Sequence, residues 1–228
     1  HDALPIYNAR SLNEHLSSSK WWNFGRKQGG LFLFTPTVTA DNSDWYRGTA
    51  DAMYQNIDFL KRRHEPYVIN TSGDCVYKLE FNRVLDFHIE KKSDITVVCK
   101  DMMYNDDVSR FGVVRMDDES RITEFDEKPI EASSNTISTG IYVIRRRQLI
   151  ELLEAAAEEN RFDFVNDILV RYKNVKKIYG YKINSYWNNI ADIDAYFKTN
   201  MDFLRPDVRS EEHTSELQSL TNLVCRLQ

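Results

Sequence analysis

Apolar runs alternate with helical stripes along the middle of the chain. Two short runs, Tyr67–Thr71 and Ile95–Cys99, have the length of buried strands. Between them, mostly apolar residues recur at helical spacing and predict a helix with one face on a core. These residues are Phe81, Val84, Leu85 and His88.

A similar stripe precedes the first run and predicts another helix. It consists of Ala50, Met53, Ile57 and Leu60. Thr49 stands at the start of this stripe, where a hydroxyl can accept a hydrogen bond from a free helical N–H group. We therefore expect Thr49 to be the N-cap.

The second half of the chain predicts a hairpin, two further strands and two helices. Arg121–Phe125 alternates like a half-exposed strand and can pair with Phe111–Arg115 across a polar turn. The other predicted elements are strands at Ile141–Ile144 and Lys177–Ile183, a helix with Leu149, Leu152, Leu153 and Ala156 turned inward, and a closing helix over Asp192–Leu204. Strands that alternate with helices of this length predict an α/β fold with a mostly parallel sheet and helices on both faces.

The two ends of the chain have a different character. Residues 1–6 and 209–228 resemble translations of the adapters used in DNA sequencing libraries, one at each end. Such sequence must be set aside before a fold is considered. We expect residues 7–208 to be the natural part of the chain and to form a single partial domain.

Charge and cysteine content narrow the class of protein. The formal net charge of −5 gives no electrostatic footprint for nucleic acid or for an anionic membrane. No apolar run approaches the roughly 18 residues that a transmembrane helix needs. Cys75 and Cys99, the two cysteines outside the adapter-like ends, have no metal-ligand spacing. They favour a reducing compartment, and we expect a cytoplasmic protein.

The first predicted strand runs directly into Ser72, Gly73 and Asp74. In parallel α/β sheets, ligands bind beyond the carboxyl ends of the strands. A glycine there allows close approach of the backbone to a ligand, and an aspartate offers a hard oxygen ligand for Mg²⁺. A glycine and an aspartate after a strand also fit a simple turn, so both interpretations stay open from these residues alone.

Several ordered segments resemble the glucose-1-phosphate adenylyltransferase family. The longest, Trp45–Asn56, is similar to the family's signature segment, and Ser72–Phe81 is similar to its metal-binding segment. Other similar segments are Ser11–Leu16, Phe111–Val114, Glu124–Pro129, Ser138–Tyr142 and Tyr186–Tyr196. The resemblance covers residues 8–208 and implies a Rossmann-like nucleotide-diphospho-sugar transferase fold that lacks its N-terminal part.

This resemblance implies a reaction and its ligands. In the family, the phosphate of glucose 1-phosphate attacks the α-phosphorus of ATP and yields ADP-glucose and pyrophosphate. Such a transfer depends on in-line positioning and on charge neutralisation, which Mg²⁺ and cationic side chains supply. The resemblance therefore implies binding of ATP or ADP-glucose and of glucose 1-phosphate, with Mg²⁺ as cofactor.

The matching segments also imply roles for individual residues. Asp74 and Lys128 would be catalytic, with Asp74 holding the metal and Lys128 meeting the sugar phosphate. Glu127 would accept hydrogen bonds from sugar hydroxyls, although a solvated charged loop is the alternative for Glu127 and Lys128. The other implied substrate-binding residues are Tyr46, Gly48, Thr49, Asp51, Gly73, Ser138, Tyr142 and Trp187. Core packing is an equally open interpretation for Tyr46.

Five positions depart from the family's pattern. Asn188 and Asn189 stand where active members have an arginine and a second metal-binding aspartate, so the second metal position at Asn189 is degenerate. Cys75 stands where the family usually has a histidine. Asn166 stands where it has a lysine, and Ala191 where it has a glycine. Because these changes dilute metal and cationic groups while the sugar-phosphate segment is kept, the chain resembles the regulatory, GlgD-type, subunit that some bacteria pair with a catalytic subunit.

Two further expectations follow from the resemblance. The family's glycine-rich ATP loop and its β-helix domain have no counterpart here, so we expect both to lie outside this sequence. The alternatives to a weakly active regulatory subunit are a fully catalytic adenylyltransferase and a scaffold that binds a partner but no ligand. A guanylyl or thymidylyl transferase is disfavoured by the Trp45–Asn56 segment.

Overall fold

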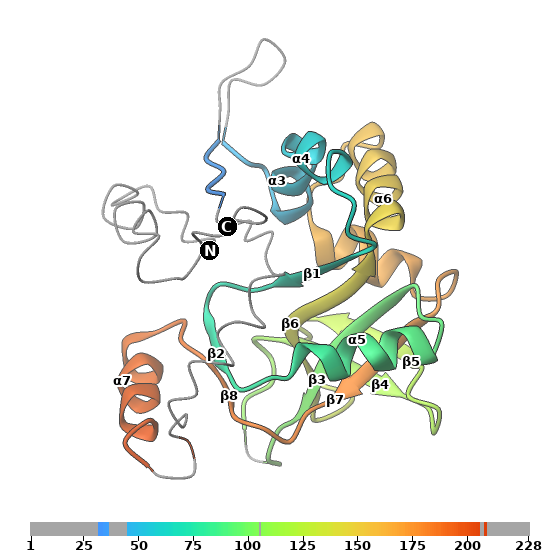
Figure 1. Ribbon diagram of the computed structural model, residues 1–228. Helices are drawn as coiled ribbons and strands as arrows, with labels where there is room; N and C mark the ends of the chain where they lie inside the picture. Colours follow the sequence, from blue (N-terminus) through green and yellow to red (C-terminus); the bar gives the residue numbers. More distant parts are fainter. Residues whose placement is uncertain (1–31, 37–44, 105, 206–207, 209–228) are drawn as a thin grey trace.

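The computed structural model describes residues 32–36, 45–104, 106–205 and 208 (Figure 1). Its strands are β1 (Tyr67–Thr71), β2 (Cys75–Tyr77), β3 (Ile95–Asp101), β4 (Gly112–Met116), β5 (Ile122–Glu127), β6 (Thr136–Arg145), β7 (Ile178–Lys182) and β8 (Trp187–Asn189). Its helices are α3 (Thr49–Gln55), α4 (Ile57–Lys61), α5 (Phe81–Glu90), α6 (Arg146–Glu158), the π-helical segment η1 (Val165–Val170) and α7 (Ile193–Asp202). The adapter-like ends and the Ser11–Leu16 segment lie outside the described residues.

The main sheet has the order β5-β4-β6-β3-β7, and β1 pairs with β6 beside this path. β6 is the longest strand and is paired with β3, β4 and β1. The predicted hairpin is confirmed, because β4 and β5 pair antiparallel. The α/β class with helices on both faces is also confirmed.

The expectation of a mostly parallel sheet is wrong, because the sheet is mixed. Only the β3–β7 pairing is parallel among the strand pairs of the described residues. The cause is the central strand β6, which runs antiparallel to its three partners β1, β3 and β4.

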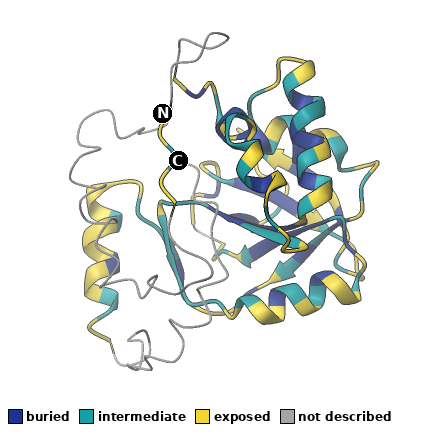
Figure 2. Ribbon diagram, turned by 45° about the horizontal axis from the view of Figure 1, so that its top comes forward, coloured by how far each residue is buried: buried dark blue, intermediate teal, exposed yellow. Residues whose placement is uncertain are grey.

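Helices cover both faces of the sheet (Figure 1). On one face, α3, α4, α6 and η1 enclose the larger core, and on the other α5 covers a second core that includes Val84, Val98 and Ile141. The four predicted inward residues of α6 are all buried: Leu149, Leu152, Leu153 and Ala156. Figure 2 shows the matching pattern, with buried strands between helices that are exposed on their outer sides.

The predicted stripe over Ala50–Leu60 forms two helices instead of one. The break falls at Asn56, whose side-chain amide donates to the Ala52 carbonyl at 2.9 Å and to the Tyr46 hydroxyl at 3.0 Å. Asparagine competes with the helical backbone in this way. The N-cap prediction was wrong as well, since Gly48 holds that position. The Thr49 hydroxyl instead accepts a hydrogen bond of 3.0 Å from the Phe164 amide.

β2, β8 and α7 form a small unit beside the main sheet. β2 and β8 form their own two-stranded sheet, and α7 follows β8 (Figure 1). Asp192 caps α7 by accepting a hydrogen bond of 2.8 Å from the Ala195 amide. Among the described residues, no helix combines the length and the apolar character that a membrane crossing requires.

Candidate functional site

Asp74, the predicted metal ligand, lies between β1 and β2 at the carboxyl end of β1. The backbone oxygen of Asp74 accepts a hydrogen bond of 2.7 Å from the Ile190 amide, which follows β8. The carboxylate is exposed at the surface. Strand order and register therefore bring the first predicted metal position next to the segment that carries the second.

The second position, Asn189, lies directly opposite Cys75 in the antiparallel pairing of β2 and β8. The Asn189 side-chain oxygen accepts a hydrogen bond of 3.1 Å from the Ala191 amide. Its Nδ2 atom donates to the Cys75 sulfur at 3.6 Å. The amide thus presents its donor side to β2 and the Asp74 loop.

Several donors converge on the Asp74 carboxylate. The Ser72 hydroxyl donates a short hydrogen bond to Oδ1, and the Cys75 thiol approaches the same oxygen at 3.4 Å. Partial desolvation acts to raise the pKa of Asp74, but hydrogen bonds from Ser72, Asn189 and Cys75 outweigh it and lower the pKa below its usual value. Burial, followed by the Asp74 charge, raises the pKa of the Cys75 thiol to about 12, so this thiol stays protonated.

These residues fit a two-carboxylate Mg²⁺ site poorly. Mg²⁺ requires oxygen acceptors, whereas the Asn189 oxygen is engaged by Ala191 and its nitrogen faces Asp74. Within the described ranges, no three His, Cys, Asp or Glu side chains are grouped closely enough to hold a metal ion. Asp74 alone could contribute a charged oxygen.

Glu127 and Lys128 lie at the end of β5. The carboxylate and ammonium groups are 3.8 Å apart, and the side chains are 20% and 65% exposed, respectively. Gly112 pairs with Glu127 across the hairpin, and a Cβ atom there would stand only 2.9 Å from the Glu127 carboxylate. Burial, partly offset by Lys128, raises the pKa of Glu127. The Glu127 carboxylate is therefore half-buried, whereas the Lys128 ammonium is exposed to solvent.

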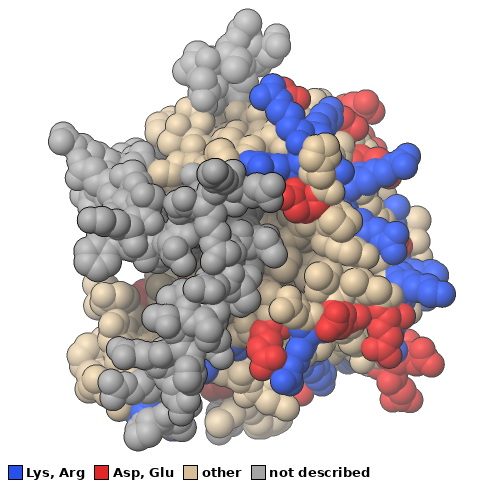
Figure 3. All heavy atoms as spheres, viewed as in Figure 1, with Lys and Arg blue, Asp and Glu red and all other residues tan. Residues whose placement is uncertain are grey.

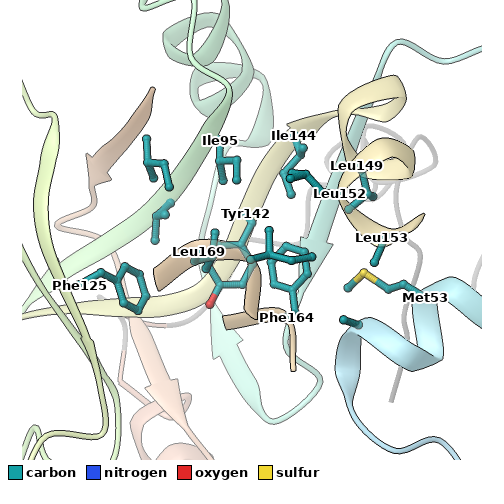
Figure 4. Close-up of a cluster of buried hydrophobic side chains, with 14 of the residues drawn as sticks. Met53, Ile95, Phe125, Tyr142, Ile144, Leu149, Leu152, Leu153, Phe164 and Leu169 are labelled. Atoms are coloured by element: carbon teal, nitrogen blue, oxygen red, sulfur yellow. The ribbon is translucent and has the colours of Figure 1, made fainter. Parts of the chain in front are cut away.

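Ser138 and Tyr142 lie on β6, and their side-chain oxygens are 3.2 Å apart. Figure 4 shows the Tyr142 ring packed among Phe164 and Leu169, with the hydroxyl at the margin of the cluster. Burial raises the pKa of Tyr142, and the charges of Glu127 and Asp163 act in the same direction. Glu127, Tyr142 and Asp163 therefore lie close enough to interact electrostatically.

Asp163 was not identified from the sequence as a site residue. Its charge contributes to the raised pKa of Glu127, after burial. It precedes η1, and its carboxylate accepts a hydrogen bond of 2.6 Å from the backbone amide of Asn166. An acidic residue between two phenylalanines was the only available signal, and it is common at helix starts.

A pocket of about 480 Å³ lies beside this group and contains two of the predicted residues, Gly48 and Thr49. Its lining also includes Arg47, Phe162 and Asp163. Positively and negatively charged side chains both line this pocket. The Arg47 guanidinium stacks over the Phe162 ring, 3.8 Å from its centroid. Figure 3 shows Lys and Arg interspersed with Asp and Glu over the described part of one molecular face.

Three of the predicted substrate-binding residues are buried and contact other side chains. The Asp51 carboxylate, 1% exposed, forms an ion pair of 3.2 Å with Arg47 and accepts a hydrogen bond from Gln55. Tyr46 is buried, and its hydroxyl accepts a hydrogen bond of 3.0 Å from the Asn56 side-chain amide. Trp187 is buried and packs edge-on against Phe111 at 5.5 Å.

One backbone feature connects the Asp74 loop with the part of the site that contains Ser138 and Tyr142. β6 bulges opposite β3, and within the bulge Gly140 has a φ of +76°. The Gly140 oxygen accepts a hydrogen bond of 2.9 Å from the Ser72 amide. A Cβ atom on Gly140 would lie 2.9 Å from the Ser72 Cβ atom. The strand that carries Ser138 and Tyr142 therefore also holds the Asp74 loop.

The α/β fold is consistent with that of a nucleotidyl transferase. A family model described as Nucleotidyl transferase matches residues 4–205, and the chain belongs to this family. Among curated proteins, the chain is similar to glucose-1-phosphate adenylyltransferases of Thermosipho melanesiensis (37% identity, 89% of this chain, 50% of the relative) and Clostridium novyi (35% identity, 88% of this chain, 53% of the relative). The chain spans about half the length of these relatives.

Proposed function

We propose that the intact protein takes part in the synthesis of ADP-glucose from ATP and glucose 1-phosphate, for glycogen formation, as a regulatory or weakly active subunit. The membership in the nucleotidyl transferase family supports the reaction class. The names of the relatives, all glucose-1-phosphate adenylyltransferase, support the substrates. The partner in this proposal is a catalytic subunit in a hetero-oligomer, and the compartment is the cytoplasm.

The observation that carries the weakly active assignment is the orientation of the Asn189 amide. A carboxylate at this position would add negative charge beside Asp74, whereas the amide places an N–H donor there. Adenylyl transfer to a sugar phosphate needs its developing charge neutralised. We therefore expect weakened Mg²⁺ binding and slow turnover from this chain's own site.

The sugar-phosphate half of the site supports continued ligand binding. The half-sheltered Glu127 carboxylate is a suitable acceptor for sugar hydroxyls, and the exposed Lys128 ammonium is a suitable point charge for a phosphate. Ser138 and Tyr142 add two hydroxyls beside them. In this proposal, the intact subunit binds glucose 1-phosphate and modulates its catalytic partner.

Pyrophosphate release measured on the intact protein tests the proposal. We expect a low rate for the purified subunit alone, and a changed affinity or turnover when it is mixed with the catalytic subunit of the same organism. A rate alone that equals the catalytic subunit's would contradict the regulatory assignment and favour a fully catalytic enzyme.

Calorimetric titration separates the third alternative, a scaffold without ligand. Glucose 1-phosphate is titrated into the intact protein with and without Mg²⁺. Binding that is independent of Mg²⁺ is expected here, because the retained sugar-phosphate residues do not depend on a metal. No detectable binding would favour the scaffold.

A further inference from the structure

The Asp74 loop is closed against β8 by contacts made entirely within the chain. The Ile190 amide donates to the Asp74 backbone oxygen at 2.7 Å, and the Asn189 Nδ2 atom donates to the Cys75 sulfur at 3.6 Å. The Ser72 hydroxyl donates to the Asp74 carboxylate. This carboxylate thus receives O–H and S–H donors, from Ser72 and Cys75, where a cation would otherwise supply positive charge.

The polarity of the amide is determined by its surroundings. The Asn189 oxygen accepts from the Ala191 amide at 3.1 Å, which leaves the NH₂ group facing Cys75 and Asp74. An NH₂ group donates hydrogen bonds and cannot ligate a cation. The side chain at this position therefore bonds the Asp74 loop in an orientation that is incompatible with a shared metal ion.

We propose that the Asn189 amide replaces the divalent cation as the link between the Asp74 loop and β8, so that this chain folds and closes the site without Mg²⁺. The inference rests on the proposed function only in assigning Mg²⁺ as the ion that a carboxylate at position 189 would share with Asp74. It predicts that a single change of amide to carboxylate converts a metal-independent contact into a metal-dependent one.

The physical reason is the charge balance between the side chains at positions 74 and 189. In N189D, the donor NH₂ group becomes an oxygen, and two carboxylates face each other across the loop. Like charges at short range disfavour the folded state, and a divalent cation between them reverses the sign of the interaction. The Ala191 amide still has its acceptor in this variant, so the change is confined to the side that faces Asp74.

Thermal unfolding tests the inference without any substrate. The melting temperatures of the wild-type chain and of N189D are compared in EDTA and in excess MgCl₂, with NaCl added to equalise ionic strength. The wild-type value should be the same in both buffers. N189D should melt several degrees below wild type in EDTA and regain most of this loss in MgCl₂.

The neighbouring residue provides a matched control. Asn188 points to the other side of β8, where its Nδ2 atom donates to the Thr199 hydroxyl at 2.6 Å. N188D introduces the same chemical change one residue away, and we expect a lower melting temperature that MgCl₂ does not restore. Equal stabilisation by MgCl₂ in wild type and N189D would overturn the inference, and so would an N189D melting temperature equal to wild type in EDTA.

A second variant decides the outcome if N189D does not fold in either buffer. The exchange D74N/N189D keeps one carboxylate and one amide at the contact but swaps their positions. It should fold and show no response to MgCl₂, and failure of this variant to fold would overturn the inference. Because no nucleotide or sugar is present, these results are independent of whether the intact protein makes ADP-glucose.

Discussion

The Ser72 amide donates a hydrogen bond of 2.9 Å to the Gly140 oxygen, which joins the loop of Asp74 to the bulge of β6. Gly140 has a φ of +76°, a region that costs little for glycine and more for residues with a Cβ atom. The bulge and the loop are therefore joined directly, so a change in one of them should disturb the other.

Replacing Gly140 with alanine should destabilise the fold and disturb both halves of the site. The new Cβ atom would lie 2.9 Å from the Ser72 Cβ atom, and the positive φ adds strain. We expect a loss of about 1–3 kcal/mol of unfolding free energy, measured by urea denaturation. The double variant G140A/S72G should recover the part that is due to the clash. No recovery would show that backbone strain alone accounts for the loss.

Restoring the carboxylate at position 189 should raise the adenylyl transfer rate of the intact subunit. N189D supplies the second charged oxygen, and we expect a gain of about tenfold or more in kcat at saturating Mg²⁺. Pyrophosphate release measures it, with N188D as the control. An unchanged rate would mean that Cys75, Asn166 or Asn188 limits the reaction instead.

Lys128 should contribute to the affinity for glucose 1-phosphate. Removing one charge-assisted contact to a phosphate weakens binding by about tenfold, which calorimetry on K128A can detect. Lys92 is a close control, because it is also an exposed lysine with a φ of 49°, so both alanine variants carry the same backbone strain. Equal affinities of K128A and K92A would argue against a phosphate contact at Lys128.

The buried His88 should make the fold sensitive to mild acid. Desolvation, with Arg145 contributing, lowers the pKa of His88 from 6.5 to about 4. Below about pH 6.5, His88 therefore binds a proton in the unfolded chain but stays neutral in the folded chain. The free energy of unfolding falls as the pH drops through this range. We expect a loss of about 2 kcal/mol between about pH 7 and pH 5, measured by urea denaturation.

The comparison with H88Q isolates this contribution, because glutamine does not titrate. H64Q serves as the control, since His64 is exposed. The wild-type protein and H64Q should show parallel pH profiles, with that of H88Q flatter. Parallel profiles for all three proteins would contradict the buried, neutral state of His88.

Asp51 should prove to be a structural residue. Its carboxylate is buried against Arg47 and Gln55, so D51N weakens a charge-assisted contact and should cost about 1–3 kcal/mol of unfolding free energy. The exposed Asp58 provides the control variant D58N, with little effect expected. Affinity for glucose 1-phosphate should stay unchanged in D51N, and a large loss of affinity would restore the substrate-binding interpretation.

Much of the fold could be predicted from the sequence because its strands and helices have strong apolar patterns. β1, the α6 core residues and the β4–β5 hairpin follow directly from apolar spacing and turn position. Strand direction could not be predicted in the same way. No local pattern in the β6 segment indicates that it lies between β3 and β4 and runs antiparallel to both.

The candidate site was predictable only in part. The resemblance assigns Asp74 and Asn189 to one metal site, and the β2–β8 pairing brings these residues near one another although they are far apart in sequence. It did not reveal which end of the Asn189 amide faces Asp74, since that depends on the Ala191 amide. Asp163 was missed because its relation to Glu127 exists only in three dimensions.

The separation of β8 from the main sheet gives this architecture a form of modularity. β8 pairs only with β2 among the described strands, and the residues that differ from the family at positions 188 and 189 lie on it. Asn188 and Asn189 are only partly buried, so their side chains can be exchanged while Trp187, the buried residue of β8, stays packed in the second core. We therefore expect substitutions at these two positions to alter the site while the interior keeps its packing.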